Sequence, residues 1–449
     1  MKPAEFTGFE ATIQELWRGG ERSLAHRVLE HRFAHCRTLA EFDMVGKLSL
    51  KTEHRSLYLQ CAQTAHGVAL TTEQKQSSRA NLISALNTMN QPEQALVLIE
   101  AQLTRTPNDF DTLCHKAANL SLMNRKAESE EILDQLMIQH PHRADQLRCM
   151  LSGRMLRQGQ LAQGVAAFIE THKPAHELFD KQLKMSRWNG IARPGTTVYV
   201  NGEGGIGDEI INVRFFDQIS RLGMRPVLFS PNNQWHRDKN RLFRRHGIEI
   251  LSESLTIDTK AVWVPMMSLP VVLNLSESEL WSGTYLQPQR SKHNRIASNR
   301  FKIGIKCSGN PWFAQDEYRK IPLETMLEYL PEDADLYYID IEKVNHPRVT
   351  DLSDRIHSWE DTLDFVDQMN CVVSSCTSLV HAAGAMGKTT FVAVPIAEYY
   401  VWISSRTDHS TPWYGDNFAV FKQQKLRDWH HPLSQIQQQL NTLMSRSHD

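Results

Sequence analysis

Cysteine is scarce in this sequence, with seven residues among 449, and no two of them stand at Cys-x-x-Cys spacing. This scarcity excludes a disulfide framework and a zinc ribbon, because both need several closely spaced cysteines. Few, scattered cysteines are typical of proteins that are kept in a reducing compartment. We therefore expect a cytoplasmic protein.

An excess of charge of one sign is also missing. The chain has 50 Lys and Arg residues against 51 Asp and Glu residues, and its formal net charge is -1. A general nucleic-acid binder usually carries a basic excess, so we expect no nucleic-acid partner. The 22 glycines and 18 prolines are too few for a collagen-like or low-complexity chain.

Long hydrophobic runs are absent as well. The first six residues hold no apolar segment of the kind found in signal peptides. The longest apolar stretches, such as residues 390–397, are far shorter than the roughly 20 residues of a membrane-spanning helix. The sequence predicts no integral membrane segment, and its length allows two to four soluble domains.

The first part of the chain has the pattern of amphipathic helices. Residues 81–87 and 94–103 place Leu, Ile and Ala at the spacing of one helix face. Asn90 and Asn124 stand 34 residues apart, as do Pro107 and Pro141, and this is the tetratricopeptide period. Less regular units are indicated at residues 143–172 and 18–42. We expect a tetratricopeptide-like array, with an irregular helical bundle as the alternative.

After about residue 188, short β-branched runs alternate with helical segments. Such alternation is typical of βαβ units and parallel sheets. A polar stretch at residues 286–300 divides this part, so two Rossmann-like α/β domains are expected. The expected strands are 196–200, 226–230, 301–307, 335–341, 371–375 and 389–394, and the expected helices are 208–222, 359–369 and 379–386.

A glycine-rich turn follows the first expected strand, with Gly204, Gly205 and Gly207 at its centre. It matches the G-x-G-x-x-G pattern, but the second strand does not end in the carboxylate that a dinucleotide site requires. What remains is a turn poor in side chains that lets a ligand approach the backbone. Asp208, just after it, is a candidate base or a charge that complements the helix dipole.

A second candidate site lies where the strand at 371–375 meets the next helix. Thr377 and Ser378 are expected to cap that helix, where free backbone N–H groups form an anion site suited to a diphosphate. His381 lies one turn further on the same face. The alternative is simple helix capping, with His381 a packed residue.

A third cluster combines a Gly-Asn-Pro turn with cations. Lys306, Arg319 and Lys320 could each neutralise phosphate, or could be solvated surface charges. The sequence shows no pattern of metal-ligating residues, so we expect no metal site.

At these residues the sequence resembles bacterial tetratricopeptide proteins whose C-terminal part is like the ADP-heptose–lipopolysaccharide heptosyltransferases. The resemblance covers about residues 188–440. Its landmarks are spread in order along that part: residues 203–208, 265–270, 308–311, 319–323, 351–353, 377–387 and 411–414.

The resemblance implies a GT-B glycosyltransferase fold. It gives a helical repeat domain at 1–187, an acceptor-side Rossmann-like domain at 188–290 and a nucleotide-sugar-binding domain at 300–449. It implies no cofactor beyond the nucleotide-sugar co-substrate. The donor-binding residues would be Ser308, Asn310, Arg319, Lys320, Cys376, Thr377, Ser378 and His381. The family usually has Asp where Cys376 stands.

The expected function is transfer of a sugar from a nucleotide-diphosphate donor to a macromolecular acceptor. Asp208 would be the catalytic base, with Glu203 the competing candidate and the three loop glycines near the acceptor. The helical repeats favour a polypeptide acceptor or partner. The alternatives are a degenerate scaffold protein and a lipopolysaccharide glycosyltransferase.

Overall fold

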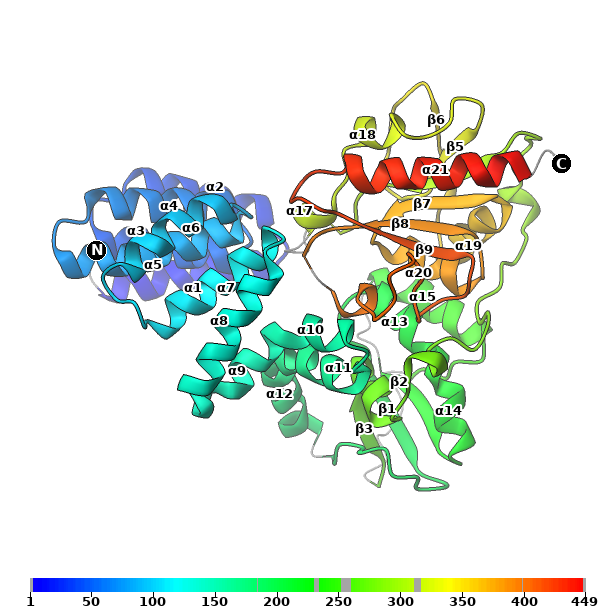
Figure 1. Ribbon diagram of the computed structural model, residues 1–449, viewed down its shortest axis with the longest axis horizontal. Coiled ribbons are helices and arrows are strands. Elements are labelled where there is room, and N and C mark those ends of the chain that lie inside the picture. Colours follow the sequence, from blue (N-terminus) through cyan, green and yellow to red (C-terminus); the bar gives the residue numbers. More distant parts are fainter. Residues whose placement is uncertain are drawn as a thin grey trace. The chain divides into compact units, whose positions relative to one another are not determined.

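The computed structural model describes residues 3–183, 185–229, 234–251, 260–310, 316–397 and 399–446 (Figure 1). The chain forms two compact units. The first unit contains residues 1–141 together with 312–317, and the second contains residues 142–311 and 318–449. Each unit is described by itself below.

The first unit is built from helices. Apolar residues one helical turn apart face its cores, which is why the amphipathic pattern of the sequence becomes helix. The prediction of helices at 81–87 and 94–103 is confirmed. The helices are α1 (Pro3–Arg18), α2 (Arg22–Ala34), α3 (Leu39–Lys51), α4 (Arg55–Val68), α5 (Thr72–Thr88), α6 (Pro92–Leu103), α7 (Phe110–Leu122) and α8 (Lys126–Gln139).

A repeated turn joins these helices in pairs. Gly20, Glu53, Asn90 and Asn124 each have a positive φ, of 86°, 59°, 56° and 60°, in the short turn between the two helices of a pair. A left-handed residue at this place reverses the chain within a few residues. The repeat of helical hairpins is therefore present in the described residues, and its tetratricopeptide identity stays a prediction.

The second unit begins with four more helices and a parallel sheet. The helices are α9 (Ala144–Arg148), α10 (Ser152–Arg157), α11 (Leu161–Ile169) and α12 (Lys173–Leu183), and Gly159 has a φ of 74° between α10 and α11. The strands are β1 (Thr197–Asn201), β2 (Arg225–Phe229) and β3 (Val262–Pro265), in the order β2-β1-β3.

Alternate side chains of β1 enter two different cores, as the period of a strand requires. Val198 and Val200 face the large core of the second unit, and Tyr199 faces a smaller core against Phe179 of α12. Helix α12 therefore covers one face of this sheet.

A six-stranded parallel sheet follows, in the order β6-β5-β4-β7-β8-β9. Counted in chain order, this is 3-2-1-4-5-6, the order of a doubly wound α/β sheet. The chain reverses its winding direction between β4 and β7. The strands are β4 (Lys302–Lys306), β5 (Asp335–Tyr338), β6 (Val349–Asp351), β7 (Cys371–Ser375), β8 (Thr390–Val394) and β9 (Phe418–Lys422).

Helices cover both faces of the larger sheet. Leu433, Ile436 and Leu440 of α21 pack on one face, where α21 runs along the sheet (Figure 1). Phe365 of α19 and Leu379 of α20 pack on the other. The remaining helices are α13 (Ile206–Asn212), α14 (Phe216–Arg221), α15 (Gln234–Arg245), α16 (Leu269–Val272), α17 (Asp316–Arg319), α18 (Leu323–Leu327), α19 (Trp359–Gln368), α20 (Ser378–Ala385) and α21 (His430–Arg446).

The predicted strands that fall in described residues are confirmed, within a few residues at their ends. The helix predicted at 208–222 is interrupted, because a 3-10 turn at Val213–Phe215 separates α13 from α14. The polar stretch at 286–300 is ordered by α19: the backbone N–H groups of Arg290 and Ser291 donate to the Asp364 carboxylate at 2.6 and 2.8 Å.

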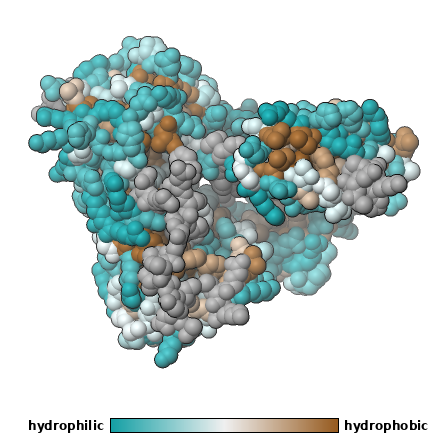
Figure 2. Space-filling view, turned by 180° about the vertical axis from the view of Figure 1, so that it is seen from behind, coloured by the Kyte–Doolittle hydropathy of each residue, from teal (hydrophilic) through white to brown (hydrophobic). Residues whose placement is uncertain are grey.

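One face of the molecule is shown in Figure 2. It is largely hydrophilic, and its hydrophobic residues gather in small separate patches. Scattered apolar groups of this kind are ordinary on a protein surface. No helix among the described residues is both long and apolar enough to span a bilayer.

Candidate functional site

The first element of the site is the edge of the larger sheet where β4 and β7 end side by side. These strands are hydrogen-bonded neighbours, with Lys306 of β4 paired with Ser374 of β7. The winding of the sheet reverses between them, and ligands of open α/β sheets bind in the crevice at such a point. The predicted donor residues at 308–310 and 376–378 directly follow these two strand ends.

Helix α20 begins at this crevice. Thr377 is its N-cap residue, and the predicted capping by its hydroxyl is wrong because its side chain accepts no bond from the first turn. The hydroxyl lies instead 3.4 Å from the Ser374 hydroxyl. The hydroxyl of Ser375 is buried and has no hydrogen-bond partner among the described residues. The first turn of α20 thus has backbone donors without a side-chain cap.

Arg319 reaches the same helix end. Its guanidinium donates to the Cys376 carbonyl at 3.0 Å. It lies across Gly309, where a β-carbon would stand 2.0 Å from a guanidinium nitrogen. A side chain at this position would displace the guanidinium from where it now lies. Arg319 therefore stands at the start of α20, and its role in phosphate binding stays a prediction.

The other predicted donor residues differ in their exposure. Ser308 is half-buried and hydrogen-bonds with Tyr338, whereas Asn310 and Lys320 are exposed. Lys306 is already paired, with its ammonium 2.5 Å from the Asp340 carboxylate. Its charge is compensated inside the protein, so of the three candidate cations it is the least suited to phosphate.

The glycine turn meets α20 from the other sheet. Gly204 has a φ of 74°, which favours glycine, and Gly205 is the N-cap residue of α13. A β-carbon on Gly207 would stand 2.7 Å from the His381 ring and 3.5 Å from the Ser378 α-carbon. The turn after β1 and the start of α20 are therefore in direct contact, and we call the region around this contact the candidate cleft.

Asp208 lies in the first turn of α13, beside this contact. One carboxylate oxygen accepts the Gly205 N–H at 2.7 Å, and the other accepts a very short hydrogen bond from the Tyr399 hydroxyl. Burial raises the pKa of Asp208 to about 6; the nearby carboxylates of Glu203 and Glu209 also raise it, and the two hydrogen bonds oppose the shift. The group can therefore exchange a proton near neutral pH.

The two other carboxylates of this region are held in place. Glu203 accepts from His176 at 2.6 Å and from the Met267 backbone N–H at 3.1 Å, which fixes the turn to α12 and to the end of β3. Glu209 lies 2.5 Å from the buried Lys239 ammonium. Glu209 is neutralised by a cation and Glu203 is bound to a histidine, so Asp208, with its pKa of about 6, is the better candidate for a base.

His381 is a packed, neutral residue. Its ring stacks on Trp402 with centroids 5.0 Å apart, and its Nδ1 lies 2.8 Å from the Tyr414 hydroxyl. Burial lowers its pKa to about 3, and the cations of Arg214 and Arg319 add to the shift. Any contact of His381 with a ligand would therefore come from an uncharged imidazole.

A buried arginine, Arg214, connects segments of the second unit that are far apart in the sequence. Arg214 donates to the carbonyls of Leu280 and Trp413 and, at 2.9 Å, to the Tyr285 hydroxyl. Its guanidinium also lies 4.8 Å from the centre of the Tyr414 ring. The aligned carbonyls and aromatic faces stabilise a charge that would otherwise be costly to bury.

Sequence reasoning missed Tyr399, His176 and Arg214, although they hold Asp208, Glu203 and the sheet contact in place. Their partners are far away in the sequence, so spacing alone gives no signal for them. The sequence held one indication of this region. Tyr414, whose ring lies against Arg214, belongs to the Thr-Pro-Trp-Tyr segment that is a landmark of the resemblance.

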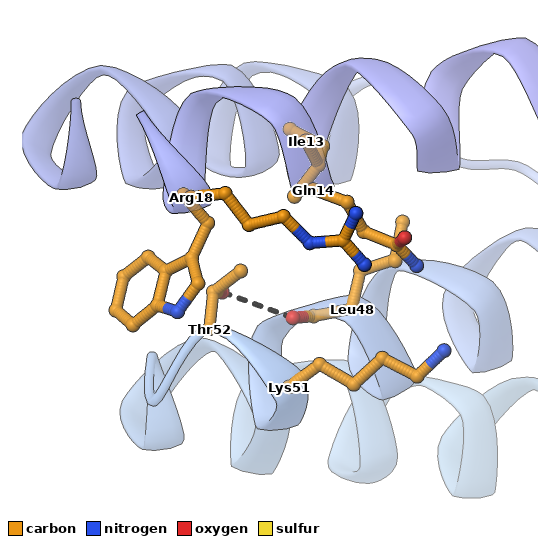
Figure 3. Close-up of a pocket in the computed structure, with 7 residues that line it drawn as sticks. Ile13, Gln14, Arg18, Leu48, Lys51 and Thr52 are labelled. Atoms are coloured by element: carbon orange, nitrogen blue, oxygen red, sulfur yellow. Dashed lines mark hydrogen bonds between the residues drawn. The ribbon is translucent and has the colours of Figure 1, made fainter. Parts of the chain in front are cut away.

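A cavity of about 260 Å³ lies in the first unit, between α1 and α3. Figure 3 shows Arg18 and Gln14 extending from α1 above Leu48 and Lys51 of α3. It shares no residue with the site around α20. Within the described residues, no group of three or more His, Cys, Asp and Glu side chains could hold a metal ion.

No protein-family model and no curated protein matches the chain. Among solved structures, the chain is similar to ADP-heptose lps heptosyltransferase II of E. coli, at 12% identity and a TM-score of 0.36 over 57% of this chain and 100% of that one. It is also similar to a glycosyl transferase family 9 protein of Veillonella parvula, at 9% identity and a TM-score of 0.37 over 57% and 99%. TM-scores below 0.5 are too low to assign a fold or a function.

Proposed function

We propose that this protein is a glycosyltransferase that moves a sugar from a nucleotide-diphosphate-sugar to a macromolecular acceptor. One observation carries the proposal: the turn that bears Asp208 touches the start of α20 through Gly207. A carboxylate with a pKa of about 6 thus stands next to a helix N-terminus suited to a diphosphate.

The donor would lie with its diphosphate at the first turn of α20. Backbone N–H groups there point along the helix dipole and bind negative charge. Arg319, held against the Cys376 carbonyl, would add a permanent positive charge. Ser308, Asn310, Lys320, Thr377 and Ser378 would line the rest of this side, with His381 as a neutral neighbour.

Asp208 would act as the general base. It would take the proton of the acceptor hydroxyl as that oxygen attacks the anomeric carbon of the sugar. The bond from that carbon to the diphosphate oxygen breaks, and the leaving nucleoside diphosphate keeps the electron pair. The negative charge that develops on it would be stabilised by the α20 N-terminus and Arg319. Attack from the face opposite the diphosphate inverts the configuration.

The acceptor proposed is a polypeptide, because helical hairpins in series offer a long surface to a protein chain. The four short turns with a positive φ in the first unit, from Gly20 to Asn124, support such a series. A lipopolysaccharide acceptor and a degenerate scaffold remain the alternatives. A measurement of sugar transfer separates the scaffold from the two transferase hypotheses, because a degenerate scaffold would transfer no sugar.

Nucleotide binding by the full chain is the first test. A ligand that binds only the folded state raises stability by about 2.7 kcal/mol at 100 times its Kd. We expect a nucleoside diphosphate at millimolar concentration to raise Tm. If none of ADP, GDP, UDP and CDP raises it, the donor assignment is wrong and the scaffold is favoured.

The second test is Asp208→Asn, which keeps the size of the side chain but cannot accept the proton. Binding of the diphosphate should be unchanged, and hydrolysis or transfer of the donor sugar should fall at least about 10²-fold. Asp217→Asn is the matched control, because Asp217 is exposed on α14. Near wild-type turnover by Asp208→Asn would leave Asp208 only a structural role at the start of α13.

A further inference from the structure

A second cavity lies in the second unit, and no residue of α20 lines it. Its volume is about 280 Å³. It is bounded by the segment from Trp402 to Thr411, by β9 and by the first turns of α21. None of the candidate donor residues lines it.

The lining of this cavity is basic. Arg406 and Lys422 supply two permanent positive charges, and the rings of His409 and His431 also line the cavity. No Asp or Glu belongs to the lining. The nearest acidic group on the same segment, Asp408, accepts the backbone N–H and the hydroxyl of Ser410 at 3.2 and 2.6 Å. An anion inside the cavity is therefore favoured.

The walls of the cavity are held in place by the fold. The Arg406 guanidinium donates to the Thr411 carbonyl at 3.1 Å and to the Ser410 hydroxyl at 3.4 Å, and its charge also interacts with the Asp408 carboxylate outside the lining. His409 has a φ of 64°, and its ring stacks on Phe421 with centroids 4.7 Å apart. A site built in advance loses less entropy when a ligand binds.

The uncharged part of the lining is rich in groups that bind hydroxyls. Hydroxyls of Ser404, Thr407 and Ser410 and amides of Gln424 and Gln435 line the cavity beside the cations. Such groups can both donate and accept hydrogen bonds. A volume near 280 Å³ is slightly below the roughly 300–1,000 Å³ of typical small-molecule sites. One sugar unit suits this size better than a nucleotide-sugar.

We propose that this cavity binds a single sugar unit that carries an anionic group, either a phosphate or a carboxylate. Arg406 and Lys422 would pair with the anion, and the hydroxyl and amide groups would pair with the sugar hydroxyls. Trp402 lines this cavity and also stacks on His381, so the site adjoins the candidate cleft without sharing its phosphate-binding residues. The proposal does not depend on the proposed transferase activity.

The test is calorimetric titration of the full chain with glucose 6-phosphate, glucuronic acid, glucose and inorganic phosphate. We expect binding of at least one of the two anionic sugars and weaker binding of glucose and of phosphate. Phosphate that binds as tightly as both anionic sugars would overturn the sugar part of the proposal. Absence of binding by both would overturn all of it.

The variant that locates the site is Lys422→Gln. Lys422 is exposed at the end of β9, so its replacement leaves the cores intact. Loss of one charged partner should weaken binding about tenfold. Lys425→Gln is the matched control, because Lys425 is also exposed, carries the same charge and lies outside the lining. Equal binding by wild type and Lys422→Gln would contradict the assignment.

Competition separates this cavity from the cleft. The same titration is repeated with saturating ADP, the probe of the proposed diphosphate site. We expect the anionic sugar to bind in the presence of ADP with an affinity within a fewfold of that without it. Full displacement by ADP would place the sugar in the cleft, and the cavity would lose its proposed role.

Discussion

At the scale of the residue, Asp208 can exchange a proton near neutral pH, but its burial lowers the stability of the protein when the carboxyl group is ionised. Its pKa in the folded protein is about 6, against the ordinary 3.8. The folded state therefore binds more protons than the unfolded state between these values. The stability that this protonation contributes is complete below pH 3.8 and is lost as the pH rises through 6. At neutral pH the buried charge is unfavourable.

Asp208→Asn should therefore raise Tm at pH 7, because it replaces the ionised carboxylate by a neutral group of the same shape. The amide oxygen can still accept the Gly205 N–H. The difference in Tm should shrink as the pH is lowered below 6, where the wild-type carboxyl is protonated as well. Thermal melts of both proteins between pH 4 and 8 measure this. A variant that melts lower than wild type at pH 7 would contradict the raised pKa.

Tyr399 tunes the same carboxyl group. Its hydroxyl donates to Asp208, which favours the ionised form and lowers the pKa of Asp208. Tyr399→Phe should raise that pKa, so the acidic limb of the rate profile should move to higher pH while the rate well above the limb changes less. Tyr400→Phe is the comparison, because Tyr400 is buried beside Tyr399, and within the described residues the hydroxyl that donates to the Asp208 carboxylate is that of Tyr399. An unmoved acidic limb in Tyr399→Phe would show that Asp208 does not control the rate.

Asp208 could be picked out from the sequence for a local reason. A carboxylate placed directly after a glycine turn is visible in the sequence as a base or a helix-end charge. Its pKa is not visible, because it depends on Tyr399, 191 residues away, and on burial by elements that join only in the fold. Whether a base is active can thus be predicted only after the two sheets have been brought together.

At the scale of the element, the glycine turn and the start of α20 lie so close together that there is no room for a side chain at Gly207. Gly207→Ala would place a methyl group 2.7 Å from the His381 ring, whereas Gly205→Ala would meet an Asp208 oxygen at 3.7 Å, an ordinary contact. We expect Gly207→Ala to lower Tm by several degrees and to weaken diphosphate binding, because the two sheets must separate slightly. Gly205→Ala should change both much less. Equal behaviour of the two variants would contradict the close contact.

The hairpin turns of the first unit allow a backbone test. Asn124 has a φ of 60°, which asparagine tolerates and most other residues do not. Asn124→Ala should destabilise by about 1 kcal/mol, and Asn124→Gly should restore most of that loss. Chemical denaturation of the full chain measures both. If Asn124→Gly is no more stable than Asn124→Ala, the asparagine acts through its side chain and not through its backbone.

The elements themselves were predictable where the pattern was long or strongly β-branched. Strands β1, β4, β7 and β8 are such runs. The sequence prediction left out β3, β6 and β9. β3 and β6 have only four and three residues, and β3 is buried along its whole length, so it shows no alternation that would separate it from a loop or a helix segment. β9 is as long as β1 and was simply missed. The hairpin turn at Gly20 falls inside the less regular unit indicated at residues 18–42, whereas the turn at Glu53 was missed, because only the 34-residue repeat was conspicuous.

At the scale of the whole molecule, the helices between residues 142 and 183 belong structurally with the sheets. Leu156, Leu161 and Val165 are part of the same core as β1 and β8, and His176 holds the glycine turn through Glu203. The first compact unit ends near residue 141. The sequence placed one helical domain at 1–187 because helical pattern continues to that point, and pattern does not reveal which core a helix enters.

Two truncations separate these roles. A chain that begins at His142 keeps α9–α12, so it should fold cooperatively and still gain stability from a nucleoside diphosphate. A chain that begins at Trp188 loses three buried aliphatic side chains, each worth about 1.5–3 kcal/mol, and leaves Glu203 without His176. It should melt well below the longer form or fail to fold. If both forms have the same Tm, α10–α12 contribute nothing to the stability of the sheets.

Transfer of sugar to a polypeptide acceptor should be lost in the His142 form, because the hairpins of the first unit are proposed to hold that acceptor. Full transfer by this form would show that the hairpins do not select the acceptor.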